Sequence, residues 1–323
     1  MIISASRRTD VAAFYTPWLM NRITAGYCAV PNPFNRNQIS HIDLRPEAVD
    51  AFVFWTRNPR PLFAHLDRLD AAGYRYYFQF TIINNPREID PKSPPLDSAL
   101  NTFIALSKRI GAERVMWRYD PIVFSPITST AYHLENFTQI ANALEGHTKR
   151  TVISIVDAYA KAKRRMAALA AQGIPVADDV AATEWLMPKL LAVAERHGME
   201  LQSCAETIDM TAYGIYPGKC VDDVLIQRVF GHDVNHKKDA GQREACGCVQ
   251  SKDIGMYDSC LFGCEYCYAT SSFATARTNH EQHDPLSPSL VGWYDAAPPT
   301  TQPTRNKIEA VAAVPGQLSF DLE

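Results

Sequence analysis

The sequence lacks any apolar run long enough to cross a membrane, and its first residues lack the long apolar core of a signal peptide. It also lacks a strong net charge. The formal value of −3 provides no overall attraction to nucleic acid, which would need a local basic patch. Hydrophobic content of 46% and charged content of 21% are those of a globular chain. We therefore expect a cytoplasmic protein with no membrane partner.

Histidine pairs with a metal-ligand spacing are missing as well. His232 and His236 are four residues apart, but Gly231 and Asn235 disfavour a helix there, so we interpret both as surface residues. Cysteine, in contrast, occurs eight times. In a cytoplasmic protein, that number indicates metal or redox chemistry rather than disulfides.

Three cysteines in the segment CLFGCEYCYA are the most informative residues: Cys260, Cys264 and Cys267. Thiolates at these spacings can bind three irons of a cuboidal iron–sulfur cluster and leave the fourth iron without a protein ligand. An open metal position is typical of catalytic rather than structural sites. Two alternatives stay open: a zinc knuckle that uses Cys246, Cys248 and two of the later cysteines, or buried free thiols.

With Tyr266 and Tyr268 around the last cysteine, this segment resembles the signature of radical S-adenosylmethionine (SAM) enzymes. It is most similar to the branch that contains spore photoproduct lyase and DNA repair photolyase-like proteins. That branch carries the signature near the N-terminus, whereas here it lies near the C-terminus. The segments TRNP, FQFTIINN and REIDPKSPPLDSAL, between Thr56 and Phe124, are similar to the middle strands of the branch. Ile89-Asp90-Pro91 stands where the branch usually has Glu-Pro.

Over roughly residues 1–295, the chain resembles an uncharacterised bacterial family, domain of unknown function 1848. The C-terminal cysteines of that family are similar to the N-terminal cluster of radical SAM proteins. The resemblance implies a 4Fe–4S cluster on Cys260, Cys264 and Cys267, with SAM chelated by the open iron. It also implies a 5′-deoxyadenosyl radical that abstracts hydrogen from the substrate, and an electron donor such as a flavodoxin or ferredoxin. The substrate is unknown, with nucleic-acid repair or modification as the named candidate.

Short β-rich runs alternate with amphipathic segments along the chain. The expected strands are Ile2–Ala5, Tyr27–Val30, Ala51–Trp55, Arg75–Phe80, Arg114–Trp117, Thr151–Val156 and Met199–Ser203. The expected helices are Pro61–Ala72, Asp97–Ile110, Ala131–Leu144 and Thr183–His197, and glycines mark their ends. This alternation indicates parallel strands joined by right-handed crossovers. It predicts a partial or complete TIM-like parallel barrel, with a doubly wound open sheet as the alternative.

The late position of the cysteine loop suggests that this is a circularly permuted radical SAM barrel, with the cluster loop near the C-terminus. A nearly closed barrel allows any strand–helix unit to come first, provided that the chain termini lie close together. We expect Ser251–Tyr257 to form a strand beside Ile2–Ala5, followed by a helix at Tyr268–Arg277. The cysteines would then share a rim with Arg7, Thr56 and Arg118.

Polar residues follow each expected strand, and in an α/β barrel these positions share the rim where active sites lie. Loop polarity explains any single cluster, but charged residues that converge on one rim indicate ion pairs or ligand contacts. Tyr159 or Tyr268 is either a hydrogen-atom relay or a packed aromatic residue. The candidates for binding SAM or substrate are Tyr266, Thr56, Asn58, Arg118 and Asp120, and the catalytic candidates are Arg7, Arg8, Asp10, Asp157, Tyr159 and Glu206.

The remaining cysteines include a second candidate metal site. Cys204, Cys220, Cys246 and Cys248 supply four thiolates, which suit an auxiliary iron–sulfur cluster or a structural zinc if the fold brings them together. Isolated thiols are the alternative. Cys28 is most simply a core residue.

Composition changes near residue 280. We expect a single α/β barrel domain over residues 1–280, with its cysteine-rich segment at 246–268, and an extended, largely disordered tail over 281–323. The end of the tail resembles the hexapeptide by which bacterial proteins bind the DNA sliding clamp, through Gln317, Leu318, Phe320 and Leu322. Chance hydrophobicity is the alternative reading of that hexapeptide.

A second function class stays open beside the enzyme. The cysteines can instead stabilise a non-enzymatic module, with zinc or an iron–sulfur cluster, that binds nucleic acid or a protein partner. Cleavage of SAM would favour the enzyme, and tightly held zinc without SAM binding would favour the module. An iron–sulfur electron carrier is a third reading, but it would need fewer charged groups on the rim.

Overall fold

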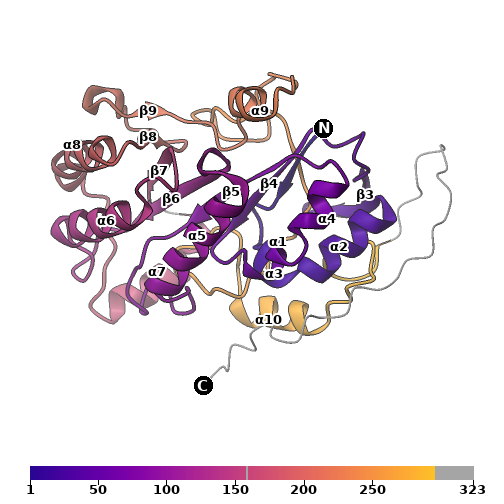
Figure 1. The fold of residues 1–323 in the computed structure, drawn as a ribbon. Coiled ribbons are helices and arrows are strands. Elements are labelled where there is room, and N and C mark those ends of the chain that lie inside the picture. The colour runs from indigo at the N-terminus through magenta and orange to yellow at the C-terminus, as the bar shows by residue number, and fades with distance from the viewer. Residues whose placement is uncertain (158, 295–323) are drawn as a thin grey trace.

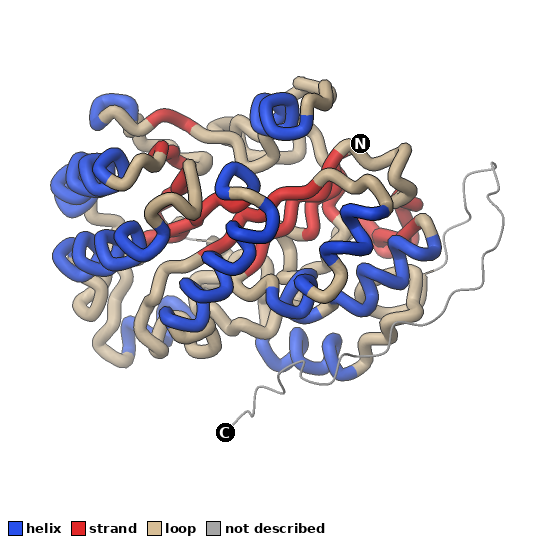
Figure 2. The backbone as a smooth tube through the Cα atoms, in the orientation of Figure 1, coloured by secondary structure: helices blue, strands red, loops and turns tan. Residues whose placement is uncertain are grey.

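The computed structural model describes residues 1–157 and 159–294, and a parallel sheet runs through its centre (Figures 1 and 2). Each neighbouring pair of strands in this sheet is parallel. The eight strands, in spatial order, are β10 (Lys252–Asp253), β1 (Ile2–Ala5), β4 (Ala51–Thr56), β5 (Tyr76–Thr81), β6 (Val115–Ile122), β7 (Arg150–Ile155), β8 (Glu200–Ser203) and β9 (Tyr216–Pro217). The predicted α/β class is confirmed. The sheet is open, since β9 pairs only with β8 and β10 only with β1.

Helices follow most of the strands. They are α1 (Val11–Phe14), α2 (Thr16–Ala25), α3 (Arg60–Phe63), α4 (Leu66–Ala71), α5 (Leu96–Ile110), α6 (Thr130–Leu144), α7 (Lys163–Ala171), α8 (Val180–Arg196), α9 (Asp223–Phe230) and α10 (Phe273–Glu281). The helix expected at Pro61–Ala72 is divided into α3 and α4, while α5, α6 and α8 lie close to their expected ranges. No helix among residues 1–157 and 159–294 has the length and apolar character needed to span a membrane.

Strand residues alternate between two packed layers, because successive side chains of a strand point to opposite faces of the sheet. In β4, Phe52 and Phe54 belong to the larger core, which includes Phe103 of α5 and Phe137 of α6. The intervening Val53 belongs to a smaller core on the other face, together with residues of α9 and of the loops around it. Both faces of the sheet are therefore covered, as parallel sheets require.

One expected strand lies outside the main sheet. Tyr27–Val30 forms part of β2 (Tyr27–Asn32), which pairs antiparallel with β3 (Asn35–Asp43) in a separate two-stranded sheet. The expectation that it belongs to the parallel sheet is wrong. A turn as short as the one between β2 and β3 can join only antiparallel strands, because parallel strands need a long crossover.

The strand before the cysteine loop lies where the permuted arrangement predicts it. Ile3 and Ser4 of β1 pair in parallel with Lys252 and Asp253 of β10, which confirms this expectation. The carboxylate of Asp253 reinforces the junction, since it accepts hydrogen bonds from Ser4 Oγ at 2.9 Å and from the amide of Arg7 at 2.8 Å. The helix after the cysteine loop, α10, begins at Phe273 rather than at Tyr268.

Residues after α10 pack on α2. Trp18 Nε1 donates to the carbonyl of Ser287 at 3.0 Å, Arg22 Nη2 donates to the carbonyl of Leu286 at 3.0 Å, and Leu290 is buried. The packed part of the chain therefore reaches beyond the expected boundary at residue 280. The sliding-clamp residues predicted at 317–322 lie outside the described residues.

Candidate functional site

A cavity of about 590 Å³ lies at the carboxyl ends of the strands. Thr56 and Thr81 end β4 and β5, and both line the cavity together with Arg118 of β6. Ligands bind at this end of the strands in α/β proteins, and the volume is that of an ordinary ligand pocket. The cysteine loop contributes another part of the wall. The expectation that the cysteines share a rim with Arg118 is therefore confirmed.

Cys260, Cys264 and Cys267 all line this cavity. Their loop closes on itself, because the amide of Cys267 donates to the carbonyl of Cys264 at 3.1 Å and the amide of Ala269 donates to Cys267 Sγ at 3.3 Å. Burial raises the pKa of the Cys260 thiol to about 12, so a bound metal would have to displace its proton. The structure thus brings the three predicted metal ligands to one wall, at the end of the sheet where ligands bind.

A buried polar network fixes the cysteine loop to the rest of the rim. The hydroxyl of Tyr266 lies 3.0 and 2.9 Å from the two carboxylate oxygens of Asp90, which is fully buried. Arg57, just after β4, donates to the same hydroxyl and lies 3.5 Å from Asp90. Asn85 Nδ2 also donates to Asp90, at 2.9 Å. Tyr266 lines the cavity, and its hydroxyl anchors the loop.

Arg57 and Asp90 were not among the predicted site residues. The acidic segment before Pro91 was the only sequence signal for Asp90. Arg57 lies beside Thr56 in the TRNP turn, and its side chain also donates to Ser93 Oγ at 2.6 Å. Both residues position the cysteine loop.

Asp10 and Thr56 hold the turn after β4. Asp10 accepts hydrogen bonds from the amide of Ala13 at 2.9 Å, from Thr56 Oγ1 at 2.9 Å and from the amide of Arg57 at 2.7 Å. Burial raises the pKa of Asp10 to about 7, against these three hydrogen bonds, which favour the carboxylate. Both residues line the cavity, whereas Asn58 does not.

Arg118 and Asp120 form an ion pair at the centre of the rim. Arg118 is 5% exposed, lies over the ring of Trp55 at 5.0 Å and donates to Gln79 Oε1 at 3.3 Å. Asp120 also accepts a hydrogen bond from Ser154 Oγ at the end of β7. The structure thus brings these two predicted ligand-binding residues into one network.

The other predicted rim residues take different positions. Arg7 is paired with Asp239 at 3.5 Å and with Asp253 at 3.7 Å. Asp157 pairs with Arg243 and accepts a hydrogen bond from Tyr159 at 3.0 Å.

Glu206 accepts a hydrogen bond from the amide of Ile155 at 2.9 Å and does not line the cavity. Burial raises the pKa of Glu206 to about 7. The rings of Tyr159 and Tyr268 lie 5.2 Å apart and both line the cavity. Their predicted roles in hydrogen-atom transfer stay predictions.

Arg8 differs from the other arginines of the cavity. Among the described residues it forms no ion pair, and its contacts are the carbonyl of Gly255 at 3.4 Å and the ring of Tyr257 at 5.2 Å. The cavity lining contains five arginines and four aspartates. Arg8 is thus the cavity cation best placed to bind an anionic group of a ligand.

The second group of cysteines also converges on this cavity. Cys204, Cys220, Cys246 and Cys248 all line it. Cys204 Sγ lies 3.4 Å from Cys220 Sγ, and Arg118 Nη1 donates to Cys220 Sγ at 2.7 Å. A hydrogen bond from Cys220, together with the charge of Arg118, lowers the pKa of Cys204 to about 6. Cys28, in contrast, is buried in β2, away from the cavity.

The side-chain positions do not form a closed metal shell. Among residues 1–157 and 159–294, no group of three or more His, Cys, Asp or Glu side chains is arranged so that it could hold a metal ion without movement. The thiols hydrogen-bond with each other or with backbone amides instead. Metal binding at either set of cysteines would therefore need side-chain rotation.

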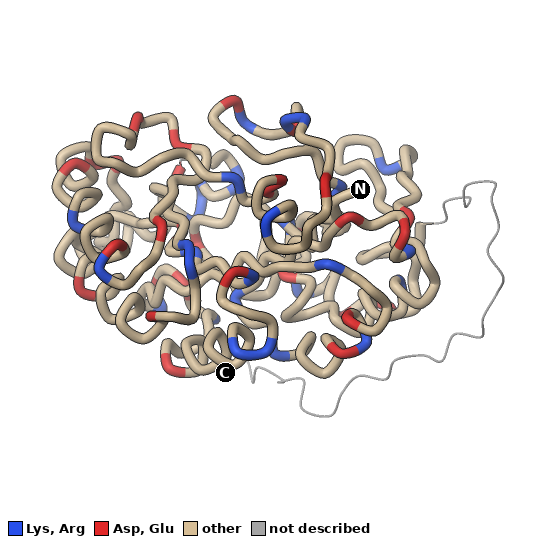
Figure 3. Tube along the Cα trace, turned by 45° about the horizontal axis from the view of Figure 1, so that its top comes forward, with Lys and Arg blue, Asp and Glu red and all other residues tan. Residues whose placement is uncertain are grey.

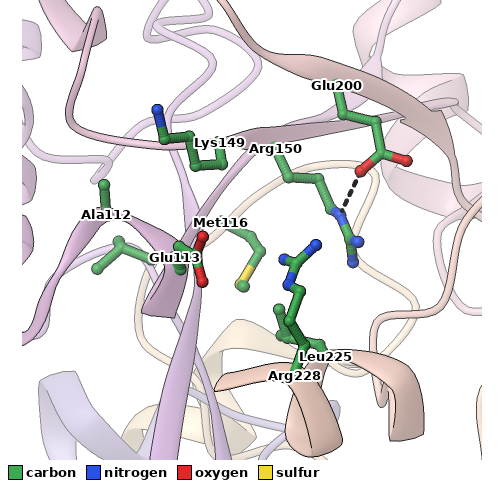
Figure 4. A pocket seen from close by; sticks show the side chains of 9 residues that line it. Ala112, Glu113, Met116, Lys149, Arg150, Glu200, Leu225 and Arg228 are labelled. Carbon is green, nitrogen blue, oxygen red and sulfur yellow. Dashed lines mark hydrogen bonds and ion pairs between the residues drawn. The ribbon is translucent and has the colours of Figure 1, made fainter.

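A much smaller cavity, of about 50 Å³, lies at the opposite ends of the strands (Figure 4). Arg150 at the start of β7 pairs there with Glu200 at the start of β8, at 3.1 Å, and also with Asp222 at 2.7 Å. Charged residues at this end of the strands indicate a role in stability rather than in ligand binding. Figure 3 shows acidic and basic positions interspersed along the chain, without a continuous basic stripe in that view.

A family model described as "Domain of unknown function (DUF1848)" matches residues 2–269, from β1 to just beyond Cys267. No curated protein matches the chain. The family predicted from the sequence is confirmed, while the resemblance to radical SAM enzymes is not tested by these comparisons.

Proposed function

This chain belongs to the DUF1848 family, and we propose that it is a radical SAM-type iron–sulfur enzyme of the cytoplasm. The observation that carries the proposal is the position of three cysteine side chains on the wall of one cavity at the carboxyl ends of parallel strands: Cys260, Cys264 and Cys267. A catalytic metal site needs an open coordination position that faces a space large enough for a ligand.

The donor set fits a 4Fe–4S cluster with one open iron. Three thiols come from a single loop, whereas structural zinc takes four protein ligands. The nearest carboxylate of the anchoring network, Asp90, is already bonded to Tyr266, Asn85 and Arg57. The positive charge of Arg57 acts on Cys264 and would offset part of the negative charge of bound thiolates.

When bound, such a cluster supplies one electron for reductive cleavage of the sulfonium of SAM. The residues of the chain would position the ligands and exclude water. Phe262 is buried against Phe14 of α1 with ring centres 4.7 Å apart, so the loop is closed on its inner side. Arg8 would bind a ligand carboxylate, and the Arg118–Asp120 pair would offer both a donor and an acceptor to a zwitterionic group.

We also propose that the sheet is an incomplete, circularly permuted barrel. From β1 through β4, β5, β6, β7 and β8 to β9, spatial order follows chain order, while β10 precedes β1 in space and follows β9 in sequence. A permuted barrel that stays open between β9 and β10 has this order.

The substrate class is part of the proposal. Repair or modification of a nucleic acid would require a base to enter the cavity, because a duplex does not fit a space of about 590 Å³. A flavodoxin or ferredoxin would be the electron donor.

A second candidate function is a non-enzymatic, metal-stabilised binding module. The convergence of Cys204, Cys220, Cys246 and Cys248 favours it, because four thiolates can close a structural site. The two candidates differ in their response to SAM.

The experiment is reductive cleavage of SAM. The protein is reconstituted anaerobically with iron and sulfide, reduced with dithionite and incubated with SAM, and 5′-deoxyadenosine is quantified together with SAM binding by equilibrium dialysis. We expect product with wild type and with Cys28→Ala, and none with Cys264→Ala, since Cys28 lies outside the cavity. Iron-loaded wild type that neither binds nor cleaves SAM would overturn the enzyme and leave the binding module.

A further inference from the structure

We propose that Cys204, Cys220, Cys246 and Cys248 form a second metal site, which binds a single thiophilic divalent ion such as zinc through thiolate ligands. This site does not depend on the iron–sulfur proposal, because its four ligands are different cysteines from those of the cluster loop. Its position follows from where the fold brings three separate segments together.

The four thiols come from three segments that meet beside β6. Cys204 directly follows β8, Cys220 follows β9, and Cys246 and Cys248 precede β10. Cys204 and Cys220 are in contact through their sulfur atoms at 3.4 Å. Cys248 reaches the same place, because its sulfur accepts a hydrogen bond from the amide of Val221 at 3.3 Å.

The sulfur–sulfur separation favours a single ion over a cuboidal cluster for this pair. With metal–sulfur bonds of about 2.3 Å, neighbouring sulfurs of a tetrahedral site lie about 3.8 Å apart. In a cuboidal cluster, each cysteine binds a different iron, so the sulfurs lie farther apart than two ligands of one ion. The 3.4 Å between Cys204 and Cys220 is therefore close to the single-ion geometry.

The surroundings match the charge of such a site. Four thiolates around a divalent ion carry a net charge of −2, and an uncompensated charge of that size is costly inside a protein. Arg118 is buried and donates to Cys220 Sγ at 2.7 Å. Its guanidinium also pairs with Asp120, so it would compensate only part of that charge. A hydrogen bond to an ionised sulfur is also stronger than one to a neutral thiol.

The segment that carries the cysteines has little regular structure of its own. Between β8 and β10, it contains only η2 (Thr211–Tyr213), the two-residue β9 and α9. Yet it covers one face of the sheet, where Val221 and Ile226 pack against Val53 and Tyr77. Loop-rich segments without a large core are commonly held by a metal or by disulfides. A metal on these four cysteines would cross-link the loops to the end of β8.

The test uses cobalt as the probe, because Co²⁺ in a tetrahedral thiolate site absorbs visible light intensely. The full chain, purified in reducing buffer and treated with chelator, is titrated anaerobically with Co²⁺ and then with Zn²⁺. We expect saturation at one cobalt per chain, a thiolate-to-cobalt absorption band and displacement by zinc. A wild-type protein that gives no tetrahedral thiolate spectrum would overturn the proposal.

Matched double variants assign the signal to one set of cysteines. Cys246→Ser/Cys248→Ser should weaken cobalt binding more than about 100-fold, beyond the loss that changes outside the ligand shell typically cause. Cys264→Ser/Cys267→Ser removes two thiols of the other loop and should leave cobalt binding unchanged. Retention of binding in the first variant, or equal loss in both, would contradict the assignment. The Cys264→Ser/Cys267→Ser variant is also reconstituted with iron and sulfide. Acid-labile sulfide bound to this variant would assign a cluster to the four cysteines of the second site and overturn the proposal of a single metal ion.

A measurement on the wild type covers the case in which the first variant does not fold. The protein is alkylated with and without Zn²⁺, and the modified cysteines are identified by mass spectrometry. Zinc should protect Cys204, Cys220, Cys246 and Cys248 and leave the modification of Cys260 and Cys267 unchanged. Equal modification of the four cysteines with and without zinc would overturn the proposal. A wild-type protein that binds cobalt as expected but does not cleave SAM would instead count against the iron–sulfur proposal alone.

Discussion

The anchoring of the cysteine loop can be tested by removing one hydroxyl group, with Tyr266→Phe. In the folded protein, this hydroxyl bonds to the fully buried carboxylate of Asp90 and accepts a hydrogen bond from Arg57. The substitution keeps the ring and leaves both charged groups without this partner. Because Asp90 has no access to water, the loss cannot be replaced by hydration.

The expected cost follows from the type of bond that is lost. Hydrogen bonds to charged groups contribute about 1.5–3 kcal/mol each, so we expect Tyr266→Phe to lower the free energy of unfolding by about 2 kcal/mol. For 323 residues, an unfolding entropy of about 0.7 kcal/mol/K converts this cost into a fall of about 3 °C in Tm. Chemical denaturation and thermal unfolding measure the two quantities.

Tyr268→Phe is the matched control, since it removes the same group two residues further along the same loop. Tyr268 is 41% exposed and donates to the carbonyl of Arg7 at 2.6 Å, so water can replace its bond. We expect a change within about 0.5 kcal/mol. Equal costs for the two variants, or no cost for Tyr266→Phe, would refute the claim that a buried network fixes the loop.

Three further predictions concern the ligand, the packing of the loop and the response to acid. Arg8→Gln should weaken SAM binding about tenfold in equilibrium dialysis, because one charge-assisted hydrogen bond is lost. Arg60 lies outside the cavity, so Arg60→Gln should leave the affinity for SAM unchanged. Equal affinities of the two variants for SAM would contradict the role of Arg8. Phe262→Ala should lower the free energy of unfolding by about 3 kcal/mol, since this ring is buried, while Phe34→Ala, 96% exposed, should change it by less than about 0.5 kcal/mol. Burial lowers the pKa of His133 from its ordinary value of 6.5 to about 4. Between pH 6.5 and pH 4, the unfolded chain therefore binds more protons than the folded protein. The free energy of unfolding should therefore fall by about 3 kcal/mol as pH drops through this window, and a His133→Asn variant with the same pH slope would contradict that assignment.

The α/β class and the place of the cysteine loop could be predicted from local patterns. The strand runs around Val53, Tyr77 and Val152 are mostly apolar because parallel strands are buried on both faces. The segment after Ser251 could be placed beside β1, because in a permuted barrel the last strand–helix unit of the chain lies next to the first strand.

Other features depend on contacts that no local pattern encodes. The run at Tyr27 is as apolar as the sheet strands, yet its partner is the adjacent polar strand β3, and only the short turn indicates this pairing. The network of Arg57, Asp90 and Tyr266 joins residues up to 209 positions apart in sequence. In the described part of the chain, Arg8 stays without a carboxylate partner, unlike the other arginines of the rim. This difference depends on how the side chains around Arg8 are placed, and sequence spacing does not give that placement.

The central claim is that the cysteine loop holds an iron–sulfur cluster with an iron that SAM can reach. The most direct measurement is the EPR spectrum of the reduced, anaerobically reconstituted protein, recorded with and without SAM. The account predicts a cluster signal that shifts when SAM is added, is retained in Cys28→Ala and is absent in Cys264→Ala. A cluster signal that SAM does not change, or one that survives in Cys264→Ala, would contradict the account.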